Sequence, residues 1–243
     1  MDNIRDKVVI ITGASSGMGA ATAKKLIFLG AKVVLAARRT EQLEPLASEL
    51  GENALFITTD VTVKKDLDDL VQQTILAFGK VDVLWNNAGI MPVSFFEEGK
   101  VDEWDRMIDT NIKGVLYGIN AVLPHMLKRG NGHILATSST SGLKTNLGGG
   151  VYSGTKFAVR AIMETLREEL AGKIKVTTLY PGAVETELFH SITSQKIFET
   201  FGGVEQFPKL DPDAIADAVI YAISQPGNIA INEITIRPLH QAM

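Results

Sequence analysis

Short, mainly apolar runs alternate along this chain with longer segments in which apolar residues recur every three or four positions. Continuous apolar runs of this length are typical of strands that are covered on both faces. Strands are predicted at residues 8–11, 33–37, 54–58, 81–85, 132–138, 174–179 and 231–236. Helices are predicted at residues 20–30, 67–78, 104–122 and 152–170, and from Pro212 onward with Asp211 as the N-cap.

Strands separated by helices predict a parallel sheet, because each return to a parallel neighbour needs a crossover connection. The expected fold class is therefore α/β, a doubly wound sheet with helices on both faces. The 243 residues contain no internal repeat and no Pro/Ser-rich linker, so we expect a single domain over residues 1–243. Residues 181–210 form an unusually long connection that carries Leu188, Phe189 and Ile197. We predict that this segment holds one or two short amphipathic helices and acts as a lid over a substrate.

Composition excludes several classes of function. The chain has 24 Lys and Arg against 28 Asp and Glu, a net charge of −4, so no basic field favours nucleic acid or an anionic membrane. It has no cysteine, which excludes disulfides and cysteine-ligated metals and agrees with a cytoplasmic location. The four histidines lack the spacing of metal ligands. We expect a cytoplasmic protein that acts on a small molecule without metal, nucleic acid or membrane.

A glycine-rich turn follows the first predicted strand. Gly13, Gly17 and Gly19 lie between that strand and the first helix. In this position glycines permit a tight turn, a close approach of backbone to a pyrophosphate, and packing of the helix on the strand. The helix N-terminus adds free N–H groups and the positive end of a dipole. A dinucleotide site is therefore predicted here, although glycines also serve ordinary turns.

The residues after the second strand indicate which dinucleotide is bound. An NAD site usually places a carboxylate there for the ribose 2′-hydroxyl, whereas this chain has Ala37 followed by Arg38 and Arg39. Arg38 could pair with a 2′-phosphate, and Ser15 or Ser16 could add a hydroxyl. The pattern favours NADP(H) over NAD(H). The alternative is a solvated pair of arginines with no ligand.

Tyr152 and Lys156 are four residues apart on a predicted helix, so their side chains share one face. A lysine ammonium close to a phenol favours the phenolate, which predicts a pKa of Tyr152 below the ordinary value of about 10. Such a tyrosine suits proton transfer to or from a substrate oxygen. Spacing alone favours an ordinary exposed helix face, where Tyr and Lys at helical spacing are common.

The glycine-rich turn, Tyr152 and Lys156 belong to a larger set of motifs along the chain. The chain carries Thr12-Gly13-Ala14-Ser15-Ser16-Gly17-Met18-Gly19, Asp60-Val61, Asn86-Asn87-Ala88-Gly89, Asn111, Ser138-Ser139, Tyr152-Ser153-Gly154-Thr155-Lys156 and Pro181-Gly182. As a set they resemble the short-chain dehydrogenase/reductase family. The resemblance implies one Rossmann-type domain with a seven-stranded sheet, a nicotinamide cofactor, and a homodimer or homotetramer.

The resemblance also assigns catalytic roles. It implies that Tyr152 is the general acid in carbonyl reduction and the base in alcohol oxidation, and that Lys156 tunes it. Asn111 would hold a water that links the lysine to solvent. Ser139, thirteen residues before Tyr152, would bind the substrate oxygen, while Ser138 would be structural.

The cofactor-binding residues implied by motif and resemblance run through most of the chain. Asp60 and Val61 would contact the adenine, and Val184 and Thr186 the nicotinamide carboxamide. Asp60 could instead be only a turn residue. The full expected set is Gly13, Ser15, Ser16, Gly17, Met18, Gly19, Arg38, Asp60, Val61, Asn87, Ala88, Gly89, Tyr152, Lys156, Pro181, Gly182, Val184 and Thr186.

These features predict an NADP-dependent oxidoreductase that interconverts a carbonyl and a secondary alcohol by hydride transfer with proton transfer from Tyr152. An alternative is a 3-hydroxy-acid dehydrogenase of the serine-dehydrogenase kind, which residues 155–170 and 233–238 resemble. Arg237 would bind its carboxylate if the chain end reached the site. A non-catalytic NADP-binding sensor is the alternative of another class. Three consecutive glycines, Gly148–Gly150, depart from common family members beside the reacting centre.

Overall fold

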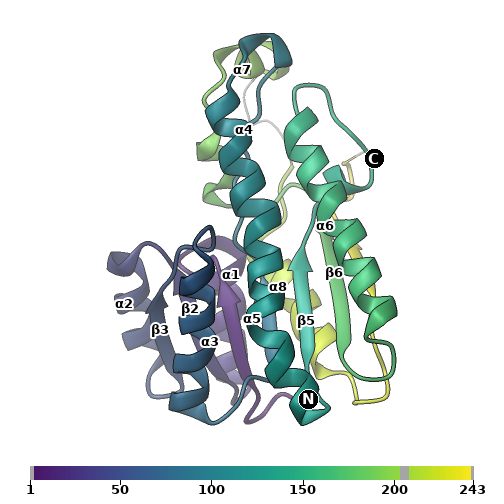
Figure 1. Ribbon diagram of the computed structural model, residues 1–243. Helices are drawn as coiled ribbons and strands as arrows, with labels where there is room; N and C mark the ends of the chain where they lie inside the picture. Colours follow the sequence, from purple (N-terminus) through teal and green to yellow (C-terminus); the bar gives the residue numbers. More distant parts are fainter. Residues whose placement is uncertain (1–2, 203–207, 242–243) are drawn as a thin grey trace.

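The strands form one parallel sheet in the order β3-β2-β1-β4-β5-β6-β7 (Figure 1). The computed structural model describes residues 3–202 and 208–241. The strands are β1 (Val8–Thr12), β2 (Lys32–Ala37), β3 (Ala54–Thr58), β4 (Val83–Asn86), β5 (His133–Thr137), β6 (Lys175–Pro181) and β7 (Glu233–Ile236). Every predicted strand is confirmed, with ends that shift by up to two residues, and every neighbouring pair is parallel.

Helices cover both faces of the sheet, as predicted. One face packs against α3 (Lys64–Phe78), α5 (Gly114–Arg129) and α6 (Gly150–Glu169). The other packs against α1 (Gly17–Phe28), α2 (Thr40–Leu50) and α8 (Pro212–Ser224). Successive strand residues alternate between the two, since Val9 and Ile11 belong to the second cluster and Ile10 to the first. This double coverage explains the continuous apolar runs in the sequence.

The helix α2 is absent from the prediction, which passed from the second strand to the third without naming a crossover. Pro45 lies inside α2 and removes one backbone donor, which obscures the helical pattern. Leu43 and Leu46 are nevertheless buried against the sheet. The parallel pairing of β2 with β3 itself requires such a crossover.

The helix predicted over residues 104–122 is interrupted. The structure has α4 (Val101–Ile108), a π-helical segment η2 (Asp109–Lys113) and then α5. Wide turns of this kind inside a helix are rare and frequently mark functional sites. Asn111 lies at the centre of η2 and is buried.

The connection after β6 contains the two short elements predicted for the lid, η4 (Glu187–Ser191) and α7 (Gln195–Phe201). In Figure 1 α7 lies beside the start of α4, far beyond the sheet. Two short segments, η1 (Phe96–Glu98) and η3 (Thr140–Gly142), complete the secondary structure around the site. Within the described residues, no helix combines the length and apolar character that crossing a membrane requires.

Polar contacts hold the connection in place. The Ser194 hydroxyl donates to Glu98 at 2.7 Å, and the Lys100 ammonium donates to Thr193 at 2.6 Å. The glycine run beside the site permits this packing, because a Cβ on Gly148 would lie 2.3 Å from the Ile197 side chain. Within the run, the close approach of Ile197 explains Gly148, and that of Phe96 in η1, 2.6 Å from where a Cβ would lie, explains Gly150.

Candidate active site

A large cavity opens at the carboxyl ends of the strands. It lies where the strand order reverses, between β1 and β4, which is where ligands bind in open α/β sheets. Its volume of about 680 Å³ is that of a typical ligand pocket. All the predicted site residues line it except Gly19 and Asn111. These two lie behind the wall of the cavity and support residues that do line it.

The glycine-rich turn has a backbone that other residues could not adopt without strain. Gly13 has φ +66°, and a Cβ there would lie 2.9 Å from the Cα of Ala88. A Cβ on Gly19 would lie 2.5 Å from the carbonyl oxygen of Gly13. The close approach seats the first turn of α1 against β1, and Gly17 and Met18 of this turn line the cavity. This arrangement fits a pyrophosphate.

Two arginines line the cavity after β2. The Arg39 guanidinium donates from Nη2 to the hydroxyls of Ser15 and Ser16, both at 2.9 Å, and pairs through Nη1 with Glu187 at 2.8 Å. Hydrogen bonds from Ser16 and Arg39 hold the pKa of Glu187 below its usual value. Arg38 lines the same cavity. Of Arg38, Arg39 and Glu187, only Arg38 belongs to the site predicted from the sequence.

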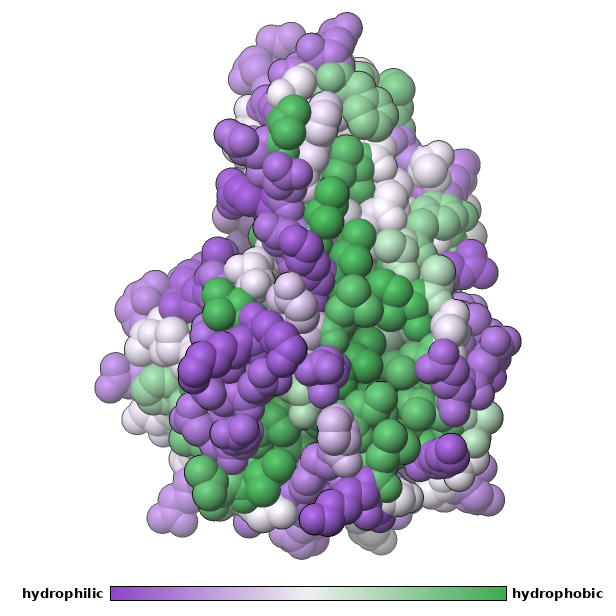
Figure 2. All heavy atoms as spheres, viewed as in Figure 1, coloured by the Kyte–Doolittle hydropathy of each residue, from purple (hydrophilic) through white to green (hydrophobic). Residues whose placement is uncertain are grey.

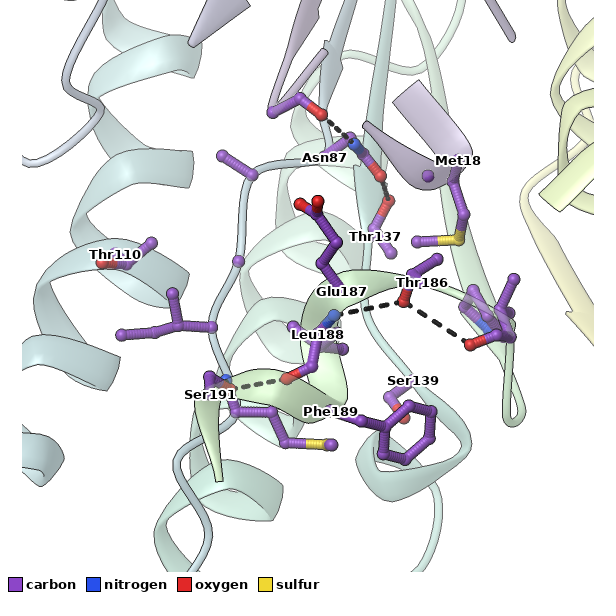
Figure 3. Close-up of a pocket in the computed structure, with 18 of the residues that line it drawn as sticks. Met18, Asn87, Thr110, Thr137, Ser139, Thr186, Glu187, Leu188, Phe189 and Ser191 are labelled. Carbon is purple, nitrogen blue, oxygen red and sulfur yellow. Dashed lines mark hydrogen bonds between the residues drawn. The ribbon is translucent and has the colours of Figure 1, made fainter. Parts of the chain in front are cut away.

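Asn87 joins the ends of three strands beneath the cavity. Its amide nitrogen donates to the Thr12 carbonyl at 3.1 Å, and its amide oxygen accepts from Thr137 at 3.2 Å. Figure 3 shows the Asn87 amide bonded to Thr137 at the cavity wall. Asp60 also acts as a turn residue, since its carboxylate accepts from the backbone N–H of Thr62 at 2.9 Å. Both side chains still face the cavity.

Three of the four residues predicted to be catalytic, Ser139, Tyr152 and Lys156, line the cavity. Tyr152 and Lys156 lie one turn apart on α6, and Ser139 follows β5 and shares a hydrogen bond with the Tyr152 hydroxyl. The Lys156 ammonium lies 5.7 Å from the centre of the Tyr152 ring. The neighbouring Ser138 turns away, because its hydroxyl donates to the Lys156 carbonyl at 2.9 Å. The two serine hydroxyls thus have different partners, the α6 backbone for Ser138 and the Tyr152 hydroxyl for Ser139.

Burial dominates the protonation of both groups on α6. It raises the pKa of Tyr152 to about 12, against a smaller opposite effect of the Ser139 hydrogen bond. It lowers the pKa of Lys156 to about 8. The predicted lowering of the tyrosine pKa is therefore not found in the free protein. The reason is that the ammonium is itself desolvated and donates to the Thr137 carbonyl at 2.8 Å rather than to the phenol.

Asn111 supports the loop that follows β4. Its amide oxygen accepts from the Ile90 N–H at 2.9 Å, and its amide nitrogen donates to the Ile90 carbonyl at 3.0 Å and to Thr155 at 3.1 Å. Gly89 lies between Asn111 and the Lys156 ammonium, both within 4 Å of where its Cβ would be. Asn111 thereby links η2, this loop and α6.

Residues 7–197 match the family described as short chain dehydrogenase. This match covers well over half of the 243 residues. The chain belongs to the short-chain dehydrogenase family. It is an oxidoreductase enzyme, and the match includes every motif on which the resemblance rests.

Relatives of this short-chain dehydrogenase are similar over almost their whole length. An uncharacterized oxidoreductase of Listeria monocytogenes is 49% identical over 98% of both chains. The closed form of a serine dehydrogenase complexed with NADP+ is 33% identical over 97% of this chain and 96% of that one, with a TM-score of 0.90. An alcohol dehydrogenase of the archaeon Thermococcus sibiricus, complexed with 5-hydroxy-NADP, is 31% identical over 98% of this chain and 99% of that one, with a TM-score of 0.88. A 3-ketoacyl-(acyl-carrier-protein) reductase of Brucella melitensis, complexed with NADH, is 32% identical over 96% of this chain and 98% of that one, with a TM-score of 0.86.

The rest of the cavity wall in this dehydrogenase comes from segments without a recognisable motif. Leu188 and Phe189 of η4 line the cavity together with Ser139 (Figure 3). Other contributors beyond the prediction are Met91, Ser141, Asn146, His190, Ser191 and Gln241. Sequence spacing gave no signal for them, because they reach the site only through the fold. Arg237 is not among the lining residues and donates to the Gln241 carbonyl at 2.7 Å.

Proposed function

We propose that this short-chain dehydrogenase interconverts a carbonyl and a secondary alcohol with NADP(H) as the hydride carrier. One observation carries the proposal. Ser139 and the buried side chains of Tyr152 and Lys156 line the same cavity as the glycine-rich turn, which fits a dinucleotide. A reacting oxygen beside Ser139 and Tyr152 would therefore lie in reach of both a proton donor and a hydride carrier.

The site residues divide the chemistry in a simple way. The bound nicotinamide supplies or accepts the hydride. In reduction the Tyr152 hydroxyl donates its proton to the substrate oxygen, while the Ser139 hydroxyl donates a hydrogen bond to the charge that develops there. The Lys156 ammonium stabilises the phenolate left on Tyr152. Asn111 holds the loop after β4 against α6 through its hydrogen bonds to Ile90 and Thr155. It would also hold the water that returns a proton to Lys156.

Cofactor preference follows from the groups after β2. Arg38 and Arg39 replace the carboxylate that would bind a 2′-hydroxyl, so a 2′-phosphate finds cations there. Two related structures hold NADP+ or an NADP derivative and a third holds NADH, which supports a nicotinamide dinucleotide of either kind. The arginines favour NADP(H). The test compares NADPH with NADH before and after Arg38→Ala, and either a preference for NADH or an unchanged ratio would contradict the assignment.

The remaining cofactor contacts are proposed from position. Asp60 and Val61 would hold the adenine, and Asn87, Ala88 and Gly89 would line its ribose. The backbone at Pro181 and Gly182, with Val184 and Thr186, would hold the nicotinamide end. Each of these residues lines the cavity, which supports the assignments.

The wall around Ser139 favours an uncharged substrate. Of the described residues that line the cavity, Arg38, Arg39 and Lys156 are those with a Lys or Arg side chain. The arginines lie at the dinucleotide end, and the lysine is engaged by Thr137. A substrate carboxylate would therefore lack a strong cationic partner. Small to medium ketones, aldehydes and their alcohols fit this wall best.

A 3-hydroxy-acid dehydrogenase is the second candidate. The similarity to the serine dehydrogenase complexed with NADP+ favours it, and His190 on the cavity wall could bind a carboxylate when protonated. The two candidates are separated by a substrate screen with NADP(H). Turnover of neutral carbonyls alone supports the first, turnover of 3-hydroxy or 3-oxo acids alone supports the second, and no turnover of any compound would indicate an NADP-binding sensor.

We also propose that the chain forms a homodimer or homotetramer through the face of α4 and α5. Figure 2 shows apolar side chains gathered over α5 and beside α6. Ile108, Leu116 and Leu127 on this face are 39%, 43% and 43% exposed in the single chain, and extensive exposed apolar surface marks interaction sites. Light scattering of the purified protein gives the oligomeric state. The cytoplasmic location stays a prediction from sequence.

A further inference from the structure

The Glu187 carboxylate, which belongs to the lid segment, contacts the hydrogen-bond donors Ser16 and Arg39 at the dinucleotide end of the cavity. Glu187 is the first residue of η4, and its Oε2 accepts from the Ser16 hydroxyl at 2.8 Å and pairs with Nη1 of Arg39 at 2.8 Å. Arg39 and Ser16 are themselves hydrogen-bonded at 2.9 Å. Three segments more than 20 residues apart in sequence thus converge on one anionic group. Figure 3 shows Glu187 rising from η4 into the cavity.

The same donors form the site that a phosphate would use. A guanidinium and two serine hydroxyls, placed after β2 and after β1, are suited to a 2′-phosphate on the adenine ribose. Hydrogen bonds from Ser16 and Arg39 keep the Glu187 carboxyl ionised at neutral pH. Two anions on one guanidinium repel each other. The carboxylate must therefore leave, or lose part of its contacts, when a 2′-phosphate binds.

We propose that Glu187 is a specificity-determining residue whose carboxylate competes with the cofactor 2′-phosphate for Arg39 and Ser16. The inference rests on the proposed use of NADP(H). In the free enzyme Glu187 occupies the phosphate site and reduces the advantage of NADP(H) over NAD(H). The competition also ties cofactor binding to the lid, because displacement of Glu187 removes the contacts of the first residue of η4 with Arg39 and Ser16. The α7 end is held separately, through Ser194 and Glu98.

The size of the effect follows from exposure. The Arg39 and Glu187 side chains are 39% and 47% exposed, so the ion pair is partly screened and its loss changes affinity only modestly. We expect Glu187→Gln to tighten NADPH binding about three- to fivefold. NADH binding should change by less than about twofold, because no phosphate meets the site.

The test measures the affinity of the full-length protein for NADPH, NADH, 2′-phospho-AMP and AMP by titration calorimetry. Glu185→Gln is the matched control, because Glu185 lies two residues away and pairs with Lys209 at 3.1 Å instead. Glu187→Gln should tighten the binding of the two ligands with a 2′-phosphate, NADPH and 2′-phospho-AMP, and leave that of AMP unchanged, while Glu185→Gln should change the affinity for none of them. In an Arg39→Ala background the gain should vanish, since the contested cation is gone. Thermal unfolding checks that each variant is folded, and Glu187→Ala serves as a second version.

The failures of the two proposals are distinguishable. If wild type prefers NADPH and Glu187→Gln leaves the NADPH/NADH ratio unchanged, the competition is refuted and the proposed function stands. Weaker NADPH binding by Glu187→Gln also refutes it, because the carboxylate would then fasten the lid over a bound cofactor. If wild type binds neither dinucleotide, the proposed function falls and the inference with it.

Discussion

The Lys156 ammonium on α6 donates a 2.8 Å hydrogen bond to the Thr137 carbonyl at the end of β5. The contact fixes the lysine beside Tyr152, at 5.7 Å from the ring centre. A neutral carbonyl does not compensate the cost of burying a charge. No salt bridge reaches Lys156 from the described part of the chain, and burial lowers its pKa to about 8. The positive charge that would stabilise a Tyr152 phenolate is therefore available only up to mildly alkaline pH.

This relationship predicts the pH dependence of carbonyl reduction. Tyr152, with a pKa of about 12, is protonated throughout the working range and can donate. Lys156 is charged below pH 8 and loses its proton above it. In the reductive direction kcat/KM should be level below about pH 8 and then fall about tenfold per pH unit. A profile that stays level to pH 9.5, with the protein shown to be folded by circular dichroism, would contradict this role of the lysine.

Replacing Gly19 in the glycine-rich turn by alanine should weaken cofactor binding and lower stability. Gly19→Ala places a Cβ 2.5 Å from the Gly13 carbonyl oxygen, so the turn must move away from α1. We expect NADPH affinity to fall by at least about tenfold, measured by fluorescence titration, and stability to fall by about 1–3 kcal/mol.

A second glycine provides the control. Gly154 is exposed in the second turn of α6, and nothing lies within 4 Å of where its Cβ would be. Gly154→Ala should raise the free energy of unfolding by about 0.5–1 kcal/mol, because alanine restricts the unfolded chain and favours the helix. Equal effects of the two substitutions on NADPH binding would refute the steric explanation.

A buried histidine predicts loss of stability in mild acid. His133 is 3% exposed at the start of β5, its Nε2 lies 2.7 Å from the Thr177 hydroxyl, and burial lowers its pKa to about 3. The unfolded chain takes up this proton near pH 6.5 and the folded chain does not, so stability falls as the pH drops below 6.5. Between pH 7.5 and 5.0 the loss from this residue should be about 2 kcal/mol.

Urea unfolding at the two pH values measures this loss. His133→Gln keeps a polar atom near Thr177 but does not titrate, so its pH-dependent loss should be smaller than that of wild type. His240→Gln, at an exposed position, should behave as wild type. The same loss in wild type and His133→Gln would disprove the explanation.

Most of the fold could be predicted from sequence because burial on both faces of a parallel sheet leaves an apolar run for every strand. The exceptions have local causes. Pro45 masked α2, and the wide turn at Asn111 leaves no trace in the spacing of apolar residues. A π-helical segment depends on side-chain contacts with distant elements, here those of Asn111 with Ile90 and Thr155.

The candidate site could be predicted only where motifs exist. Residues that follow strand ends, such as Gly13, Asn87 and Ser139, reach the cavity because the carboxyl ends of parallel strands share one edge. Glu187 reaches Arg39 across about 150 residues of sequence through the path of the lid, and no spacing rule encodes that. The pKa of Tyr152 was predicted in the wrong direction, because the sequence reveals the neighbouring charge and not the depth of burial.

The central claim is that Tyr152 transfers the proton in an NADP-dependent carbonyl reduction. The most direct test is the rate of NADPH-dependent reduction by Tyr152→Phe on a substrate that wild type reduces, with NADPH affinity measured in parallel. The variant keeps the buried ring and removes only the hydroxyl that bonds to Ser139. We predict a rate loss of about 10²–10⁴-fold with NADPH affinity unchanged within about twofold. A variant that keeps more than about a tenth of the wild-type rate would contradict the account.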